Sequence, residues 1–234
     1  MRMRSAIGIA AVAAASLVAL APAATAYDAD RYSYAAGHMI QPSDIPASLQ
    51  IKPTMNFSAN PNTDKVWLCS KDSSWLGYPG GTDAYNANYY GKKKNSETVT
   101  LTQSVMQYDS FTDAQKAFSS LTKQLKKCDG KASGTDIFED GSSLQWSRLT
   151  TSGSVPLVTV VGVESQSLNV NYTSSNTTSS GDSVDNSDNY QVYTLVNDVI
   201  ITTSYYNGDT LNIDSATRKQ INQVAFNAVS RWLD

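Results

Sequence analysis

Residues 110–130 read SFTDAQKAFSSLTKQLKKCDG and predict the clearest helix of the chain. Ser110 and Asp113 have the spacing of a capping box, and an acid in the first turn suits the positive end of the helix dipole. Gly130 follows the last turn as a stop signal. Apolar residues recur at helical spacing and define one buried stripe: Phe111, Ala114, Ala117, Phe118, Leu121, Leu125 and Cys128.

Strand patterns lie on both sides of this helix. Residues 66–69 form a short apolar run, and residues 98–108 alternate as a half-buried strand does. Residues 144–146, 155–163 and 168–172 continue the strand pattern, whereas residues 72–95 and 173–189 have the composition of loops. Two β-rich runs, 190–196 and 199–206, flank Asn197-Asp198, and this arrangement predicts a tight hairpin.

A second amphipathic helix ends the chain. Asp214 or Ser215 caps it, and its apolar residues keep the i, i+3, i+4 spacing as far as Leu233. Two helices separated by hairpin-linked strands predict an α+β fold. We therefore expect an antiparallel β-sheet with the two amphipathic helices packed on one face and one disulfide.

The first 26 residues have the three parts of a signal peptide. Basic residues at positions 2 and 4 precede an uncharged apolar run over 6–20, and Ala24-Thr25-Ala26 is a small-residue cleavage site. Residues 27–64 contain four prolines, which exclude a long helix, so we expect an extended or irregular N-terminal arm. Residues 65–234 then form the domain.

N-terminal sequencing of the exported protein is expected to start at or within a few residues of Tyr27. No later stretch approaches the roughly 18 uncharged apolar residues that a membrane-spanning helix needs. Tyr27 also stands where a bacterial lipoprotein has its lipid-bearing cysteine. A mature N-terminus that carries lipid, or retention of residues 1–26, would contradict the prediction of a soluble, secreted, extracellular protein.

The two cysteines, Cys69 and Cys128, predict one disulfide. An exported chain meets an oxidising compartment, and an even number of cysteines with no third thiol favours a single bridge. The bridge would close a loop of 58 intervening residues, a constraint worth roughly 4 kcal/mol in the chain-entropy treatment.

Charge and motif content exclude several functions. The formal charge of −3 becomes −5 once Arg2 and Arg4 leave with the signal peptide, which argues against nucleic acid or an anionic membrane as partner. His38 is the only histidine, and neither a Gly-x-Ser-x-Gly elbow nor a phosphate-binding glycine loop is present. We expect no catalytic residue, cofactor or metal site.

Five aromatic residues form the candidate ligand-binding site: Trp75, Tyr78, Tyr85, Tyr89 and Tyr90. They fall within 16 residues that also contain Pro79-Gly80-Gly81. Large aromatic side chains on a glycine-bearing loop provide contact area of the kind found at interfaces and sugar-binding platforms. The other interpretation is that some of these rings pack over the disulfide as a small additional core.

The order of these elements resembles the PknH-like extracellular sensor domain, an actinobacterial family found outside the serine/threonine kinase PknH and in stand-alone mycobacterial lipoproteins. The similar segments are residues 105–110 leading into the helix, the helix end Cys128-Asp129-Gly130, and the hairpin of residues 193–201 followed by the terminal helix. The resemblance implies a compact α+β domain with a cleft and a ligand-sensing role, and it brings no catalytic residues. Many members have two disulfides, whereas this chain has cysteines for one.

The expected function is that of a secreted, non-enzymatic sensor-like domain that binds a small molecule, lipid or glycan outside the cell. One alternative is a secreted carbohydrate-active hydrolase that uses Asp136, Glu139 and Asp140, because paired carboxylates cleave glycosides. The other alternative is a structural component of the cell envelope. Carboxylates lining a cleft would favour the hydrolase, and aromatic and aliphatic residues would favour binding.

Overall fold

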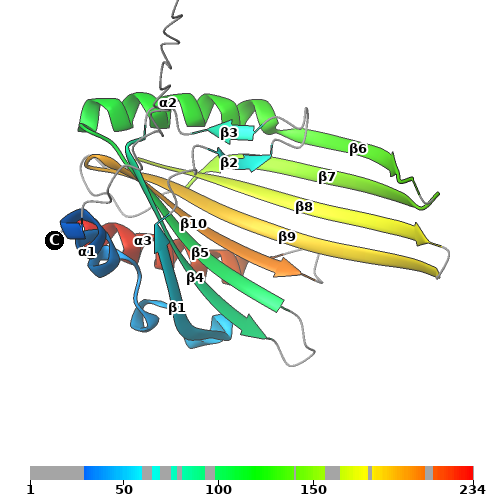
Figure 1. Ribbon diagram of the computed structural model, residues 1–234, viewed down its shortest axis with the longest axis horizontal. Helices are drawn as coiled ribbons and strands as arrows, with labels where there is room; N and C mark the ends of the chain where they lie inside the picture. The colour runs from blue at the N-terminus through cyan, green and yellow to red at the C-terminus, as the bar shows by residue number, and fades with distance from the viewer. Residues whose placement is uncertain are drawn as a thin grey trace, which may run out of the picture.

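The computed structural model describes residues 29–59, 65–68, 75–77, 81–92, 98–139, 141–155, 164–178, 181–208 and 213–233. Its main element is an eight-stranded sheet in the order β1-β4-β5-β10-β9-β8-β7-β6, in which every neighbouring pair is antiparallel (Figure 1). The strands are β1 (Ile51–Ala59), β4 (Asp83–Lys92), β5 (Thr98–Gln107), β6 (Gly130–Ile137), β7 (Ser143–Ser154), β8 (Glu164–Thr178), β9 (Gly181–Val196) and β10 (Val199–Gly208). The predicted antiparallel α+β architecture is confirmed.

The smaller elements are a two-stranded sheet, β2 (Lys65–Leu68) with β3 (Trp75–Gly77), and the helices. The helices are α1 (Ala29–His38), α2 (Phe111–Cys128) and α3 (Ser215–Leu233), with the 3-10 turns η1 (Pro42–Asp44) and η2 (Ala47–Leu49). The hydroxyl of Ser110 accepts a hydrogen bond from the backbone N–H of Asp113 at 3.2 Å, which confirms the predicted start of α2. The predicted hairpin is also present between β9 and β10, with Asn197 at φ 48°.

The two long helices lie on opposite faces of the sheet, so the prediction that both pack on one face is wrong. The side chains of β10 show this directly, because Ile200 belongs to the core beneath α2 whereas Val199 and Ile201 belong to the core beneath α3. Adjacent residues of a strand point to opposite faces. The central sheet is therefore buried on both sides, between α2 on one face and α3 with α1 on the other (Figure 1).

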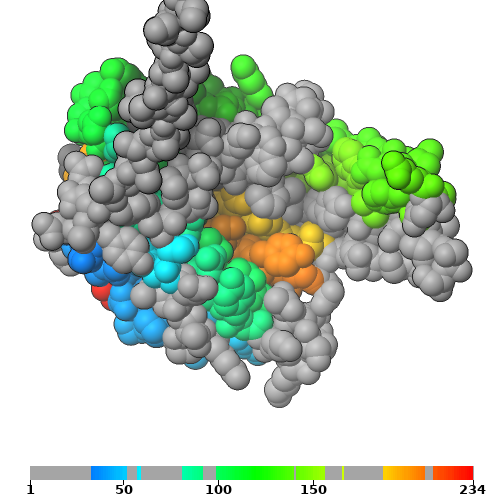
Figure 2. All heavy atoms as spheres, viewed as in Figure 1, coloured from blue at the N-terminus to red at the C-terminus, as the bar shows by residue number. Residues whose placement is uncertain are grey.

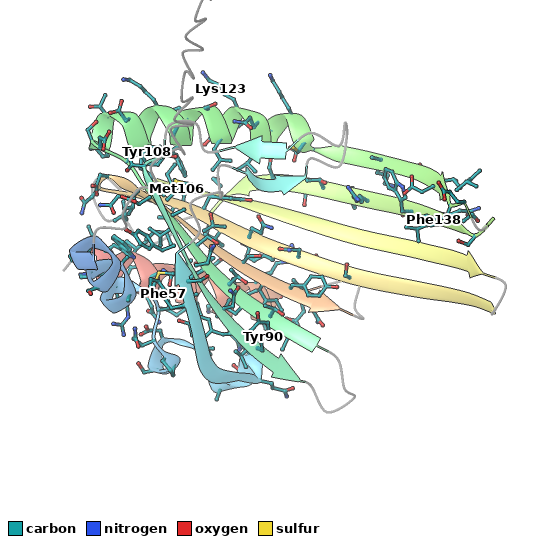
Figure 3. All side chains as sticks on the ribbon, viewed as in Figure 1. Phe57, Tyr90, Met106, Tyr108, Lys123 and Phe138 are labelled. Carbon is teal, nitrogen blue, oxygen red and sulfur yellow. The ribbon has the colours of Figure 1, made fainter. Side chains whose placement is uncertain are left out.

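Two segments predicted as loops contain strands. Residues 72–95 include β3 and β4, and residues 173–189 are shared between the end of β8 and the start of β9. In the second segment β8 and β9 pair from Thr173↔Asn186 to Thr178↔Gly181, so backbone hydrogen bonds hold a polar ribbon that has no apolar periodicity. These long strands extend with β6 and β7 beyond the helices, and we call this part the strand extension (Figure 1). Figure 3 places Phe138 near its far end.

Within the N-terminal arm, 27–64, buried residues between 35 and 51 pack against the sheet and α3. Met39, Ile40 and Leu49 are buried, and the backbone N–H of Ile40 donates to Gln103 Oε1 at 2.6 Å. Its carbonyl oxygen accepts a hydrogen bond from the Tyr89 hydroxyl. Helix α1 precedes the prolines and was not anticipated, and β1 continues the arm as an edge strand of the main sheet.

Two buried phenols, Tyr89 and Tyr108, should make the fold sensitive to alkali. Burial, assisted at Tyr89 by the Asp44 carboxylate, raises the pKa of each well above its ordinary value. In the unfolded chain both ionise near pH ~10, so only the unfolded state loses these protons as the pH rises through that value. We expect the free energy of unfolding to fall above that pH and tyrosinate absorbance to appear together with unfolding.

Tyr108→Phe is the control for this pH dependence. The Tyr108 hydroxyl is buried and has no hydrogen-bond partner among the described residues, so its removal should cost little stability at neutral pH. The decline of stability in alkali should then become shallower. An unchanged decline in Tyr108→Phe would contradict the role assigned to this phenol.

Candidate functional site

The two faces of the central sheet are buried to different extents. On the α3 face, the row Tyr89, Leu101, Tyr205 and Tyr190 is buried across four strands. On the α2 face, burial by apolar residues is concentrated at one end, in the row Ala84, Met106, Ile200 and Leu195. Met106 and Tyr108 lie near α2 in Figure 3. On β4, β5 and β10 the α2 face therefore becomes polar and more accessible with distance from α2, whereas Gln191 and Asn189 on β9 stay buried.

The accessible part of this face is the candidate site, and we call it the open face. Strand alternation and pairing place its residues in two adjacent rows, each of which crosses β4, β5 and β10. The first row is Asn88, Thr102 and Ser204, and the second is Tyr90, Thr100 and Tyr206. Figure 2 looks onto the corresponding strands, with β4 and β5 in teal and β10 in orange at the surface.

Hydroxyl and amide groups on the open face are linked across strands. The Thr102 hydroxyl donates to Asn88 Oδ1 at 2.9 Å, and the Ser204 hydroxyl donates to Asn189 Oδ1 at 3.1 Å. Asn189 is buried on β9 beside this row. None of the six open-face residues carries a charge. These bonds hold side chains in place while other donors and acceptors of the same groups face the partly exposed surface.

Two exposed tyrosines mark one end of the open face. Tyr90 and Tyr206 are 52% and 39% exposed, and each pairs with Thr100 from opposite sides. Because one strand separates them, their backbones are about 10 Å apart. The hydroxyl end of the Tyr206 ring lies against Gly208, where an added Cβ would stand 3.3 Å from both Cε1 and the phenol oxygen.

Trp146 on β7 is a contrasting aromatic residue. Its indole lies against Gly134 on β6, where a Cβ would stand 2.6 Å from Cζ2, and the guanidinium of Arg148 covers the ring at 4.9 Å from its centroid. The indole is thus contacted by two other residues and is only partly exposed. Tyr90 and Tyr206 are more exposed.

Of the five aromatic residues predicted as one site, the three whose side chains are described lie on two different faces of the sheet. Tyr85 and Tyr89 are fully buried in the core beneath α3, where the Phe57 ring stacks with Tyr85 at 6.2 Å between centroids. Tyr90 projects to the other face and belongs to the open face. The backbone of Trp75 lies in β3, but its side chain, like the whole of Tyr78, lies outside the described residues. Their role stays a prediction.

The residues weighed for catalysis do not gather in a described site. Asp136 and Glu139 are exposed at the end of β6 and in the turn after it, and Asp140 lies outside the described residues. The His38 ring stacks on Tyr34 at 3.8 Å, and its Nδ1 lies 2.7 Å from the Tyr34 carbonyl oxygen. Within the described ranges, no three His, Cys, Asp or Glu residues lie close enough together to hold a metal ion.

Thr100, Thr102, Ser204 and Tyr206 were not singled out from the sequence. The signal was the alternation of β5 and β10. Apart from Met106 and Ile200, the open-face side of these two strands carries polar residues at even-numbered positions, while the odd-numbered positions include the apolar core residues. None of the helices in the described ranges combines the length and apolarity needed to cross a bilayer.

Comparison with known proteins identifies a family and a similar solved structure. The family model of the PknH-like extracellular domain matches residues 69–202. The crystal structure of the extracellular domain of PknH from Mycobacterium tuberculosis is similar to this chain, with a TM-score of 0.47 and 11% sequence identity over 83% of this chain and 94% of that one. No curated protein matches the chain.

Proposed function

Because the chain belongs to the family of PknH-like extracellular domains, we propose that it is a secreted, sensor-like domain that binds a ligand without transforming it. The ligand binds on the open face. The observation that carries this proposal is the unequal burial of the sheet, since the α3 face is buried across four strands while polar groups and two tyrosines stay accessible on the α2 face.

The non-enzymatic part of the proposal is supported by the composition of the open face. Its six residues offer hydroxyl, amide and phenol groups, which position a ligand by hydrogen bonds and contact area. A general acid–base pair is usually built from His, Asp or Glu side chains held on the substrate, and none of the six open-face residues is of these types. The exposed positions of Asp136 and Glu139 also disfavour a two-carboxylate hydrolase.

The predicted aromatic residues of β3 are compatible with this placement. β3 lies next to α2, on the side of the sheet that carries the open face (Figure 1). Trp75 and Tyr78 therefore remain candidates for additional ligand contact at the α2 end of the site. Trp75→Ala should weaken binding and leave the melting temperature nearly unchanged if its ring contributes contact area at the surface.

Nuclear magnetic resonance mapping tests the location of the site. The isotope-labelled secreted protein is titrated in turn with neutral oligosaccharides, phospholipid vesicles, and a mixture of amino acids and nucleosides. We expect one of these probes to shift the amide signals of Thr100, Thr102 and Ser204 most strongly. Mass spectrometry should recover that probe unchanged.

Three results would contradict the proposal. Signals that shift only on α2 or at the far end of strands β6 to β9 would place the site elsewhere. Conversion of the probe into a product would show an enzyme. A complete lack of response to all three classes would favour a structural component of the cell envelope.

A further inference from the structure

We infer that the ligand of the open face is a neutral glycan, an inference that rests on the proposed function and specifies its ligand. The six residues of the open face combine hydroxyl and amide groups with two exposed phenol rings, and none of them is charged. A neutral sugar presents hydroxyl groups around its ring and weakly polar C–H faces above and below it. Those two chemistries match the two kinds of side chain present.

The hydrogen-bonded row supplies the polar half of this match. Asn88 Oδ1 already accepts from the Thr102 hydroxyl, so the amide N–H groups of Asn88 are the groups left to donate to a ligand. The Thr102 oxygen retains lone pairs and accepts. Sugar hydroxyls both donate and accept, so a row that offers both roles with fixed geometry satisfies them. A carboxylate or phosphate would meet no cationic partner among these six residues.

The tyrosine row supplies the aromatic half. The backbones of Tyr90 and Tyr206 are about 10 Å apart across β5, a span longer than one pyranose ring. The ligand that engages both rings is therefore an oligosaccharide rather than a monosaccharide. Gly208 leaves room for the Tyr206 ring on the sheet surface. Among the described residues, no cation covers the Tyr206 ring in the way that Arg148 covers Trp146.

The same features disfavour the other ligand classes. A lipid tail needs an apolar groove. Two polar rows instead cross β4, β5 and β10 between Met106 and the tyrosines: Asn86, Ser104 and Thr202, then Asn88, Thr102 and Ser204. An anionic ligand would be recognised through Arg or Lys, and none of the six open-face residues is an Arg or Lys. A neutral glycan is the class whose polar and apolar surfaces are both accommodated.

Titration calorimetry of the secreted protein with linear neutral hexose oligomers tests the inference, with an acidic polyuronate as the comparison. The neutral oligomers are expected to bind with a dissociation constant that does not change between low and high salt, because no ion pair is screened. Tyr206→Ala should weaken binding about tenfold, the effect of losing one aromatic contact of about 1.4 kcal/mol. Tyr206→Phe, which keeps the ring, should restore most of the affinity.

Tyr34→Ala is the matched control. Tyr34 is 50% exposed, like Tyr90, but it lies on α1, beside His38 and Trp232 on the α3 side of the sheet. Its loss should leave glycan affinity unchanged. Equal losses in Tyr34→Ala and Tyr206→Ala would overturn the assignment of the tyrosine row.

Failure of the glycan inference is distinguishable from failure of the proposed function. Salt-sensitive binding of the polyuronate alone, or of phospholipid vesicles alone, with shifts still centred on Thr100 and Thr102, would keep the site and overturn the neutral glycan. Binding of the neutral oligomers at a different surface would overturn both. Binding of neutral oligomers that stays unaffected in Tyr206→Ala and Tyr90→Ala would overturn the stacking arrangement and with it the inference.

Discussion

Tyr89→Ala is expected to lower the free energy of unfolding by about 3–5 kcal/mol, the cost of removing a large buried aromatic side chain. Tyr89 is fully buried between the sheet and the N-terminal arm, and its hydroxyl donates to the carbonyl oxygen of Ile40. The substitution opens a cavity and also leaves a buried carbonyl without its partner. Urea denaturation followed by circular dichroism measures the loss.

The neighbouring residue provides the control. Tyr90 is one position further along β4 and therefore points to the other face, where it is 52% exposed. Tyr90→Ala should change the free energy of unfolding by no more than about 0.5 kcal/mol. Tyr89→Phe should fall between the two, because it keeps the ring and loses only the hydrogen bond to the arm. Similar losses in Tyr89→Ala and Tyr90→Ala would contradict the placement of β4 and of the open face together.

The helices were predictable because each has its own periodicity. The predicted stripe is buried from Ala114 to Cys128, whereas its first member, Phe111, is exposed. Asp214 accepts from the backbone N–H of Thr217 at 2.6 Å at the start of α3. The helix patterns do not show on which face of the sheet each helix packs. That information lay in the strands, since β9 and β10 are apolar at consecutive positions such as Leu195-Val196 and Ile200-Ile201. A strand that is apolar on both sides is typical of a sheet covered on both faces.

The errors in the strand prediction have two physical origins. In β4 the alternation of Tyr85, Ala87 and Tyr89 with Asn86 and Asn88 was present, but the density of tyrosine and the glycines nearby suggested a loop. The paired ends of β8 and β9 are different. They consist largely of Ser, Thr, Asn and Asp, so no apolar side chains recur, and only the backbone pairing between these two neighbouring segments makes them strands.

Only one residue of the candidate site was predicted, because local sequence patterns do not show which strands lie side by side. Tyr90 was identified through its neighbours in sequence, but the residues that surround it on the open face come from β5 and β10. Thr100 and Tyr206 meet Tyr90 only through the sheet register, which a local pattern does not contain. The sequence identified Tyr90 by its residue type, but only the fold shows which residues lie beside it.

A disulfide between Cys69 and Cys128 is expected to contribute about 2–5 kcal/mol to stability, the usual loss when a native bridge is removed from a secreted domain. Cys128 is buried at the last residue of α2. Cys69 lies outside the described residues, but it directly follows β2, whose Leu68 pairs with Trp75 of β3, and β3 lies next to α2 (Figure 1). The chain path therefore brings the segment before Cys69 toward the helix that carries Cys128.

Cys128→Ser and Cys69→Ser are each expected to show this loss in urea denaturation, and the double variant should lose no more than either single one, because both remove the same covalent bond. Reductant should destabilise the wild-type protein by a similar amount and leave all three variants unchanged. Lys123→Ser on the exposed side of α2 (Figure 3) is a control for substitution in this helix and should shift stability by no more than about 0.5 kcal/mol. Two cysteines that react with iodoacetamide in the native protein without reductant, or additive losses in the double variant, would show that the two thiols act separately. The link between the β2–β3 hairpin and α2 would then depend on non-covalent packing alone.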